Sequence, residues 1–127
     1  MPGRKSLNYK VLLILAPVLI VIGALGFILP AGTSPTSIEP AYNIFHIVLG
    51  TIGLILIIFR YENPIRLFNI IFGIIDIYQA VASFTNVFPE ELFKWTAVDD
   101  VLHLVVGIAL VSIGLYGFMP MRKIYGN

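Results

Sequence analysis

The sequence of 127 residues contains no cysteine, and only 12% of its residues are charged. The absence of cysteine excludes disulfides, thiolate metal ligands, cysteine nucleophiles and lipid attachment through cysteine. A formal net charge of +1 provides no clustered basic surface, so we expect no nucleic acid partner. The chain also lacks GxSxG, HExxH and phosphate-binding glycine-loop motifs. These absences favour a non-enzymatic protein.

Hydrophobic residues, by contrast, make up 58% of the chain, and the mean hydropathy is +0.94. A soluble domain averages about 45–50% apolar and about 25% charged residues, so this composition indicates an integral membrane protein. Four continuous apolar runs approach the ~20 residues that a spanning helix needs. Because none of them alternates polar with apolar residues, spanning strands are excluded. The expected spans are 11–29, 41–59, 65–87 and 97–118.

Short connections between these runs predict an all-α fold, an antiparallel four-helix bundle in a single transmembrane domain over residues 1–127. With the N-terminus inside, the outer side carries only Lys94. The inner side carries Arg4, Lys5, Lys10, Arg60, Arg66, Arg122 and Lys123. This asymmetry follows the positive-inside rule and predicts that both termini are cytoplasmic.

The fourth run carries Asp99, Asp100 and His103 in its first third. Ionisable side chains at membrane depth cost roughly 2.5–3.5 kcal/mol each on insertion scales, so they require partners or a function. The spacing Thr96-x-x-Asp99 fits a capping box, in which the two residues exchange hydrogen bonds at a helix start. Asp99 therefore has a structural explanation from the sequence alone, and Asp100 has a weaker one.

The second run repeats part of this pattern, because His46 precedes Gly50 as His103 precedes Gly107. Both runs start on the outer side, so we expect the two histidines at similar height in the outer half. The similarity suggests that the two helix pairs form a two-fold internal repeat about an axis along the membrane normal. Small residues allow helices to approach closely. The expected packing glycines are Gly50, Gly53, Gly73, Gly107 and Gly114.

The third run contributes a polar stripe, in which Asn69, Gly73, Asp76 and Gln79 share one helical face. Asp76 lies near the middle of its run, where an unpaired carboxylate is very unfavourable. It must therefore be protonated or paired. Because Arg66, at the inner end of this run, is the only Lys or Arg within the four expected spans, the two histidines are the candidate cations at depth.

Together these side chains predict a polar cluster in the outer half of the bundle. Its expected members are His46, Asp76, Gln79, Asp99, Asp100 and His103. The simplest interpretation is a hydrogen-bonded network that orients the helices and binds no cofactor. Outside this cluster, we expect Tyr42, Trp95 and Tyr116 to be anchors at the membrane interface.

Three functional hypotheses compete with that interpretation. Paired histidines on facing helices can ligate a b-type haem, with Gly50 and Gly107 providing space for the porphyrin. His46, His103 and Asp100 or Asp76 can alternatively hold a divalent metal such as iron or zinc. In the third hypothesis, Asp76 and the histidines form a proton relay or a site for a small transported substrate.

Three motifs carry a resemblance to a known family. They are Phe45-His46…Gly50…Gly53-Leu54, Phe68-Asn69…Phe72-Gly73…Asp76 and Asp99-Asp100…Leu102-His103…Gly107…Gly114-Leu115. From about Pro40 to Tyr116 the chain resembles an uncharacterised family of small four-span bacterial membrane proteins, a domain of unknown function. The resemblance implies four helices in the bacterial inner membrane and implies no activity, substrate or cofactor.

The sequence thus predicts a small non-enzymatic component of the bacterial inner membrane, structural or accessory in role. Its immediate partner is the lipid bilayer. Glycine-rich helix faces also favour self-association, as a homo-oligomer or as a subunit of a larger membrane complex.

Overall fold

The computed structural model describes residues 5–116, and this part of the chain is all-helical. Its elements are α1 (Leu7–Ile28), α2 (Pro40–Phe59), α3 (Glu62–Thr85), α4 (Glu90–Phe93) and α5 (Ala97–Tyr116). Four helices are long and one is a single turn. Some sequence-based predictions fall on residues outside this range. They concern three basic residues of the charge asymmetry, Arg4, Arg122 and Lys123, and residues 117 and 118 of the fourth expected span.

Local sequence explains where the long helices begin and end. The hydroxyl of Ser6 accepts a hydrogen bond of 3.0 Å from the backbone N–H of Tyr9, so α1 begins at Leu7, earlier than the expected span. Pro40 occupies the first turn of α2, where its missing N–H is harmless. Arg60 and Asn86 end α2 and α3 in the left-handed conformation, with φ of 55° and 56°.

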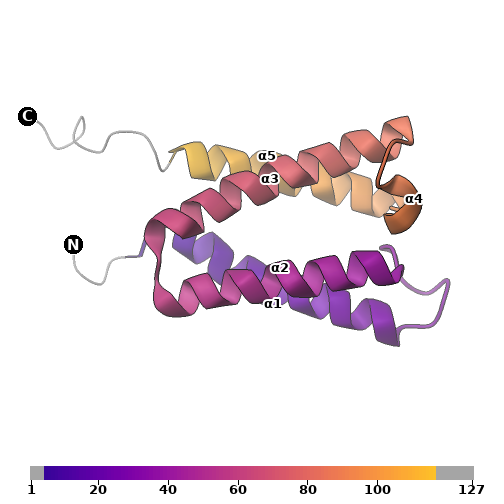
Figure 1. Cartoon of the computed structure of the whole chain (residues 1–127), viewed down its shortest axis with the longest axis horizontal. Helices are drawn as coiled ribbons and strands as arrows, with labels where there is room; N and C mark the ends of the chain where they lie inside the picture. Colours follow the sequence, from indigo (N-terminus) through magenta and orange to yellow (C-terminus); the bar gives the residue numbers. More distant parts are fainter. Residues whose placement is uncertain (1–4, 117–127) are drawn as a thin grey trace, which may run out of the picture.

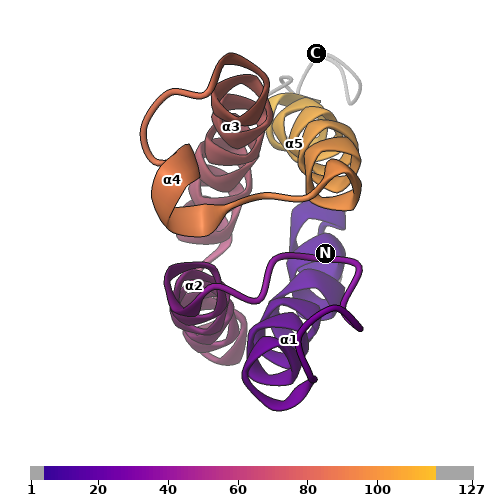
Figure 2. The ribbon, with the colours of Figure 1, turned by 90° about the vertical axis from the view of Figure 1, so that its right-hand side faces the viewer.

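The four long helices pack as two pairs, α1 with α2 and α3 with α5 (Figure 1). Viewed along the helices, the pairs lie one above the other, and α4 with its flanking loops covers one end (Figure 2). We call this end the α4 end. The opposite end holds the short α2–α3 connection at Arg60 and Tyr61.

Glycines bring the helices of each pair into backbone contact. A Cβ atom added at Gly73 would lie 2.8 Å from the carbonyl oxygen of Gly107, and one added at Gly107 would lie 2.8 Å from that of Gly73. In the other pair, a Cβ at Gly50 would lie 2.7 Å from the carbonyl oxygen of Ala16. Gly53 lies against Ala16 and Leu12, and Gly114 lies against Ile70. All five expected packing glycines therefore lie where two helices touch.

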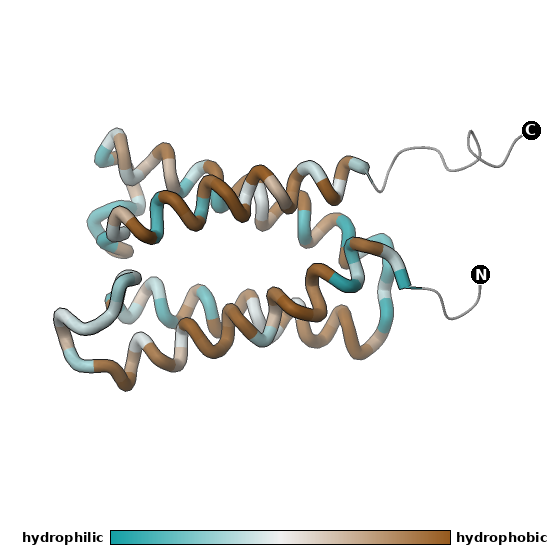
Figure 3. The backbone as a smooth tube through the Cα atoms, turned by 180° about the vertical axis from the view of Figure 1, so that it is seen from behind, coloured by the Kyte–Doolittle hydropathy of each residue, from teal (hydrophilic) through white to brown (hydrophobic). Residues whose placement is uncertain are grey.

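The long helices consist mostly of apolar residues (Figure 3), and many of their large apolar side chains are exposed. Ile14 and Ile58 are each 70% exposed and Phe84 is 74% exposed, with many similar side chains around them. Each of the four long helices is long and apolar enough to cross a membrane. The expectation of an all-helical chain with four long apolar helices is thus confirmed over the described residues.

Two aromatic residues differ from the sequence-based expectation. Tyr42 and Trp95, expected as anchors at the membrane interface, are only 2% and 7% exposed. Tyr42 lies on the inward face of α2, and α4 folds the chain so that Trp95 packs against the ends of the helices. Tyr116 is exposed, in agreement with a surface position.

Candidate functional site

Asp99 is the centre of a hydrogen-bond network at the α4 end, which we call the Asp99 knot. Its carboxylate, fully buried, accepts hydrogen bonds from the Tyr42 hydroxyl at 2.6 Å and from the Ser37 backbone N–H at 2.8 Å. It also accepts one from the backbone N–H of Thr96 at 2.9 Å. A carboxylate with three donors at the start of α5 is stabilised by those bonds and by the helix dipole.

Thr96 completes the capping box that the sequence predicts. Its hydroxyl oxygen accepts a hydrogen bond of 3.1 Å from the backbone N–H of Asp99, reciprocating the bond from its own N–H. The same hydroxyl lies 2.7 Å from the carbonyl oxygen of Pro35, its acceptor in the loop after α1. The knot thus joins the α1–α2 loop, α2 and the start of α5.

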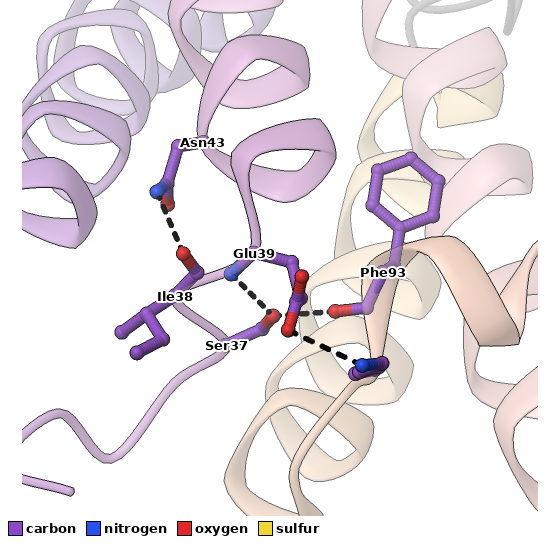
Figure 4. A network of polar contacts seen from close by, with 6 residues as sticks. Ser37, Ile38, Glu39, Asn43 and Phe93 are labelled. Atoms are coloured by element: carbon purple, nitrogen blue, oxygen red, sulfur yellow. Dashed lines mark hydrogen bonds and ion pairs between the residues drawn. The ribbon is translucent and has the colours of Figure 1, made fainter. Parts of the chain in front are cut away.

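Further polar contacts attach this loop to α4. The Ser37 hydroxyl donates to the carbonyl oxygen of Phe93 and accepts from the backbone N–H of Glu39 at 3.2 Å (Figure 4). The side-chain amide of Asn43 donates to the carbonyl oxygen of Ile38 at 3.2 Å. At the surface, the carboxylate of Glu39 lies 3.7 Å from the ammonium of Lys94. The α4 end is therefore closed by interactions between segments that are distant in sequence.

The two histidines lie side by side below the Asp99 knot, as their matching positions in the two runs predict. Their ring centroids are 6.3 Å apart, and their planes are inclined by 20°. The Tyr42 ring lies 4.1 Å from that of His46 and 6.4 Å from that of His103. Trp95 approaches His103 edge-on, with centroids 6.2 Å apart.

A cavity of about 150 Å³ lies next to these rings and is bordered by all four long helices. Its polar lining consists of Tyr42, His46, Asp76 and His103. Asp76 is 2% exposed and has no hydrogen-bond partner among the described residues. Nδ1 of His103 is likewise buried without a partner. We call this the His–Asp cavity.

The structure divides the predicted polar cluster. His46, His103 and Asp76 meet at the cavity, and Asp99 lies next to it through Tyr42. Gln79 is buried with its carbonyl oxygen unpartnered, and Asp100 is partly exposed; neither lines the cavity. The six residues that the sequence groups together therefore do not form one continuous network.

An apolar groove of about 360 Å³ lies between α1 and α5, next to the cavity. The two spaces are adjacent, because Leu15, Val18 and Val106 line both. Every residue that lines the groove is apolar. A partly polar cavity and a wholly apolar groove therefore lie side by side between the helices.

A second polar contact joins the helix pairs at the opposite end. The side-chain amide of Asn69 on α3 donates to the side-chain and backbone oxygens of Asn8 on α1, at 3.0 and 3.2 Å. The Asn8 amide in turn lies 3.4 Å from the carbonyl oxygen of Ile113 on α5. Both asparagines are buried, so these bonds clamp three helices together.

The size of the cavity and the positions of the acidic and histidine side chains test the haem and metal hypotheses. A dry cavity of about 150 Å³ holds one benzene-sized ring, so the His–Asp cavity is too small for a porphyrin between His46 and His103. Within residues 5–116, no three His, Asp or Glu side chains gather closely enough to hold a metal ion. The proposed metal set of His46, His103 and Asp100 is thus not assembled.

Comparisons with protein-family models, with curated proteins and with solved structures found no match for this chain. Any functional proposal therefore rests on the geometry of the described residues.

Sequence reasoning did not identify Tyr42, Ser37 or Asn8 as members of these networks. Tyrosine near a helix start in an apolar chain resembles an interface anchor. Ser37 lies in a loop of ordinary turn composition, and Asn8 precedes the expected first span. Only Asn8 carried a usable signal, because it lies four residues before the apolar Leu12 on the face that α1 buries.

Proposed function

We propose that this protein is a small, non-enzymatic component of the bacterial inner membrane, with a structural or accessory role. The Asp99 knot is the observation that carries the proposal. The most deeply buried acidic side chain is fully engaged in joining the α1–α2 loop, α2 and α5, which is a structural task. Four long apolar helices with apolar outer faces support placement in a bilayer.

In this proposal the long helices form an antiparallel bundle with both termini in the cytoplasm and the α4 end outside. Among residues 5–116, Lys94 is the only Lys or Arg at the α4 end, whereas Lys5, Lys10, Arg60 and Arg66 lie at the other. This distribution satisfies the positive-inside rule.

The bundle further consists of two related helix pairs, as a two-fold internal repeat. Each pair is closed by glycine contacts, and each places a histidine four residues before a glycine, at His46–Gly50 and His103–Gly107. This repeated pattern is also the basis for proposing membership of the uncharacterised family of four-span bacterial membrane proteins.

The absence of cysteine permits a direct test of the arrangement. Single cysteines replace Thr33 and Glu91 at the α4 end, and Lys5 and Tyr61 at the opposite end; all four positions are exposed. In intact cells, a membrane-impermeant maleimide should label only the first two. The other two should react only after permeabilisation. The reverse pattern contradicts the orientation, and labelling of all four in intact cells contradicts insertion.

An accessory role requires a neighbour in the membrane, either a second copy or another subunit. Phe84 is 74% exposed on α3, so a photoreactive phenylalanine analogue there should cross-link to whatever covers that face. A second analogue at Phe72, which is 3% exposed, is the buried control and should give no cross-link. We expect an adduct that contains protein. Adducts with lipid alone at Phe84, and at an equally exposed position such as Ile58, would contradict the accessory role.

A further inference from the structure

The polar end of the His–Asp cavity has unused hydrogen-bonding capacity. Nδ1 of His46 lies 2.8 Å from the carbonyl oxygen of Tyr42, which can only accept, so this nitrogen is the donor and Nε2 is free for another partner. Nδ1 of His103 and the carboxyl group of Asp76 have no partner among the described residues. His46, His103 and Asp76 are 5%, 6% and 2% exposed. A buried polar atom without a partner is costly, so the buried Nδ1 of His103, next to the unbonded carboxyl group of Asp76 and Nε2 of His46, indicates a missing ligand.

Shape and lining restrict the chemistry of that ligand. The cavity of about 150 Å³ suits a head no larger than one six-membered ring, and the aromatic side chains of Tyr42 and Phe72 border it. The apolar groove of about 360 Å³ between α1 and α5 suits a hydrocarbon tail. The ligand therefore has a compact polar ring and an apolar chain.

Charge excludes the commonest lipids. No Lys or Arg lines the cavity, whereas Asp76 does, so a phosphate or carboxylate head would find no permanently charged counter-ion and would face an acidic group. The head must instead be neutral. It must also offer hydrogen-bonding groups to imidazole and carboxyl partners, each of which can donate or accept according to its protonation.

We propose that the His–Asp cavity binds the ring of a lipid-soluble quinone or its quinol, with the isoprenoid tail in the groove between α1 and α5. The two ring oxygens of a quinone accept hydrogen bonds, and those of a quinol also donate them. His46, His103 and Asp76 supply the matching groups on the protein. The inference concerns binding alone, and it rests on the membrane location given under Proposed function.

Trp95 provides a built-in reporter. It is the only tryptophan in the sequence, and its ring centroid lies 6.2 Å from that of His103 at the edge of the cavity. Quinones quench tryptophan fluorescence at short range. The probe is 2-decyl-1,4-benzoquinone, whose ring carries no substituent besides a saturated ten-carbon tail, added to the full-length protein in detergent micelles. We expect quenching that saturates and that excess 1-decanol, which has the tail without the ring, does not reverse.

Matched variants separate binding in the cavity from partition into the micelle. Val106 lines both cavity and groove, so Val106→Phe should weaken the apparent affinity at least about tenfold. Val101 lies on the same helix, is 62% exposed and lines neither space, so Val101→Phe should leave the affinity unchanged. Asp76→Leu removes a polar partner while keeping an apolar side chain of similar size, and should also weaken binding at least about tenfold.

Several outcomes would overturn the proposal. Quenching that rises without saturation, or equally in Val106→Phe and the parent protein, would mean partition into the detergent only. Full reversal by 1-decanol would mean a general chain-binding groove with no recognition of the ring. If the Asp76→Leu variant keeps the affinity of the parent protein, the carboxyl group of Asp76 does not contact the ligand. The cysteine-labelling experiment tests membrane insertion separately, so the two proposals can fail independently.

Discussion

The hydroxyl of Tyr42 donates a hydrogen bond of 2.6 Å to the carboxylate of Asp99, joining residues 57 positions apart in sequence. The same tyrosine ring lies 4.1 Å from the ring of His46, tilted by 34°, and borders the His–Asp cavity. One residue therefore connects the network that closes the α4 end to the space between the helix pairs. A substitution that weakens the Asp99 knot should therefore change both the packing of the α4 end and the shape of the His–Asp cavity.

Tyr42→Phe removes one donor from a fully buried carboxylate and keeps the ring. We expect the free energy of unfolding to fall by about 1.5–3 kcal/mol, the range for hydrogen bonds to charged groups. Titration with SDS in detergent micelles, followed by circular dichroism, measures this change. Tyr61→Phe is the matched control, because Tyr61 is 52% exposed and has no hydrogen bond through its hydroxyl among the described residues. An equal loss in both variants would contradict a special role for Tyr42.

Asp99→Ala leaves three donors without their acceptor, namely the Tyr42 hydroxyl and the backbone N–H groups of Ser37 and Thr96. Each buried unsatisfied group costs about 1–3 kcal/mol, so the free energy of unfolding should fall by at least about 3 kcal/mol. Asp100→Ala should lose less than about 1 kcal/mol, mainly through the helix dipole, because Asp100 accepts no hydrogen bond from described side chains. The same SDS titration compares the two, and similar losses would show that the Asp99 knot contributes little.

Gly73→Ala places a methyl group 2.8 Å from the carbonyl oxygen of Gly107, which is backbone and cannot rotate away. Helices α3 and α5 must separate, and overpacking of this kind costs about 1–3 kcal/mol. Ile74→Ala, at a neighbouring position that is 55% exposed, should be nearly neutral in micelles. Thermal unfolding of the two variants in one detergent provides the measurement. A Gly73→Ala protein as stable as the parent would contradict direct backbone contact.

Asn69→Ala removes the donor that joins α3 to Asn8 on α1. Hydrogen bonds between membrane helices average about 0.6 kcal/mol and reach about 1.7 kcal/mol, and the fully buried position of Asn69 favours the upper part of that range. Thr51→Ala is the control, because the Thr51 hydroxyl bonds only within its own helix, to the carbonyl oxygen of Ile47 at 2.7 Å. If the double variant Asn8→Ala/Asn69→Ala loses the sum of the single losses, the two side chains do not interact.

The long helices and the glycines at their contacts could be predicted from the sequence alone. Apolar runs of spanning length, the Ser, Pro and Thr residues at helix starts, and the glycines spaced along α2 and α5 all act locally or through simple periodicity. His46 and His103 could also be placed at one height, because both follow a helix start by a similar number of residues. The capping box at Thr96 and Asp99 is confirmed for the same reason, since both partners lie within one helical turn.

Which polar groups share a network could not be predicted from the sequence, because it depends on how the helices pack together. The partners of Asp99 include Ser37 and Tyr42, and that of Asn69 is Asn8, each separated by more than fifty residues and by loops without regular structure. Gln79 lies on the same helical face as Asp76 yet does not line the cavity, and Asp100 follows Asp99 directly yet takes no part in the Asp99 knot. Helical periodicity fixes the face on which a side chain lies, whereas the packing of one helix pair on the other fixes what that face meets.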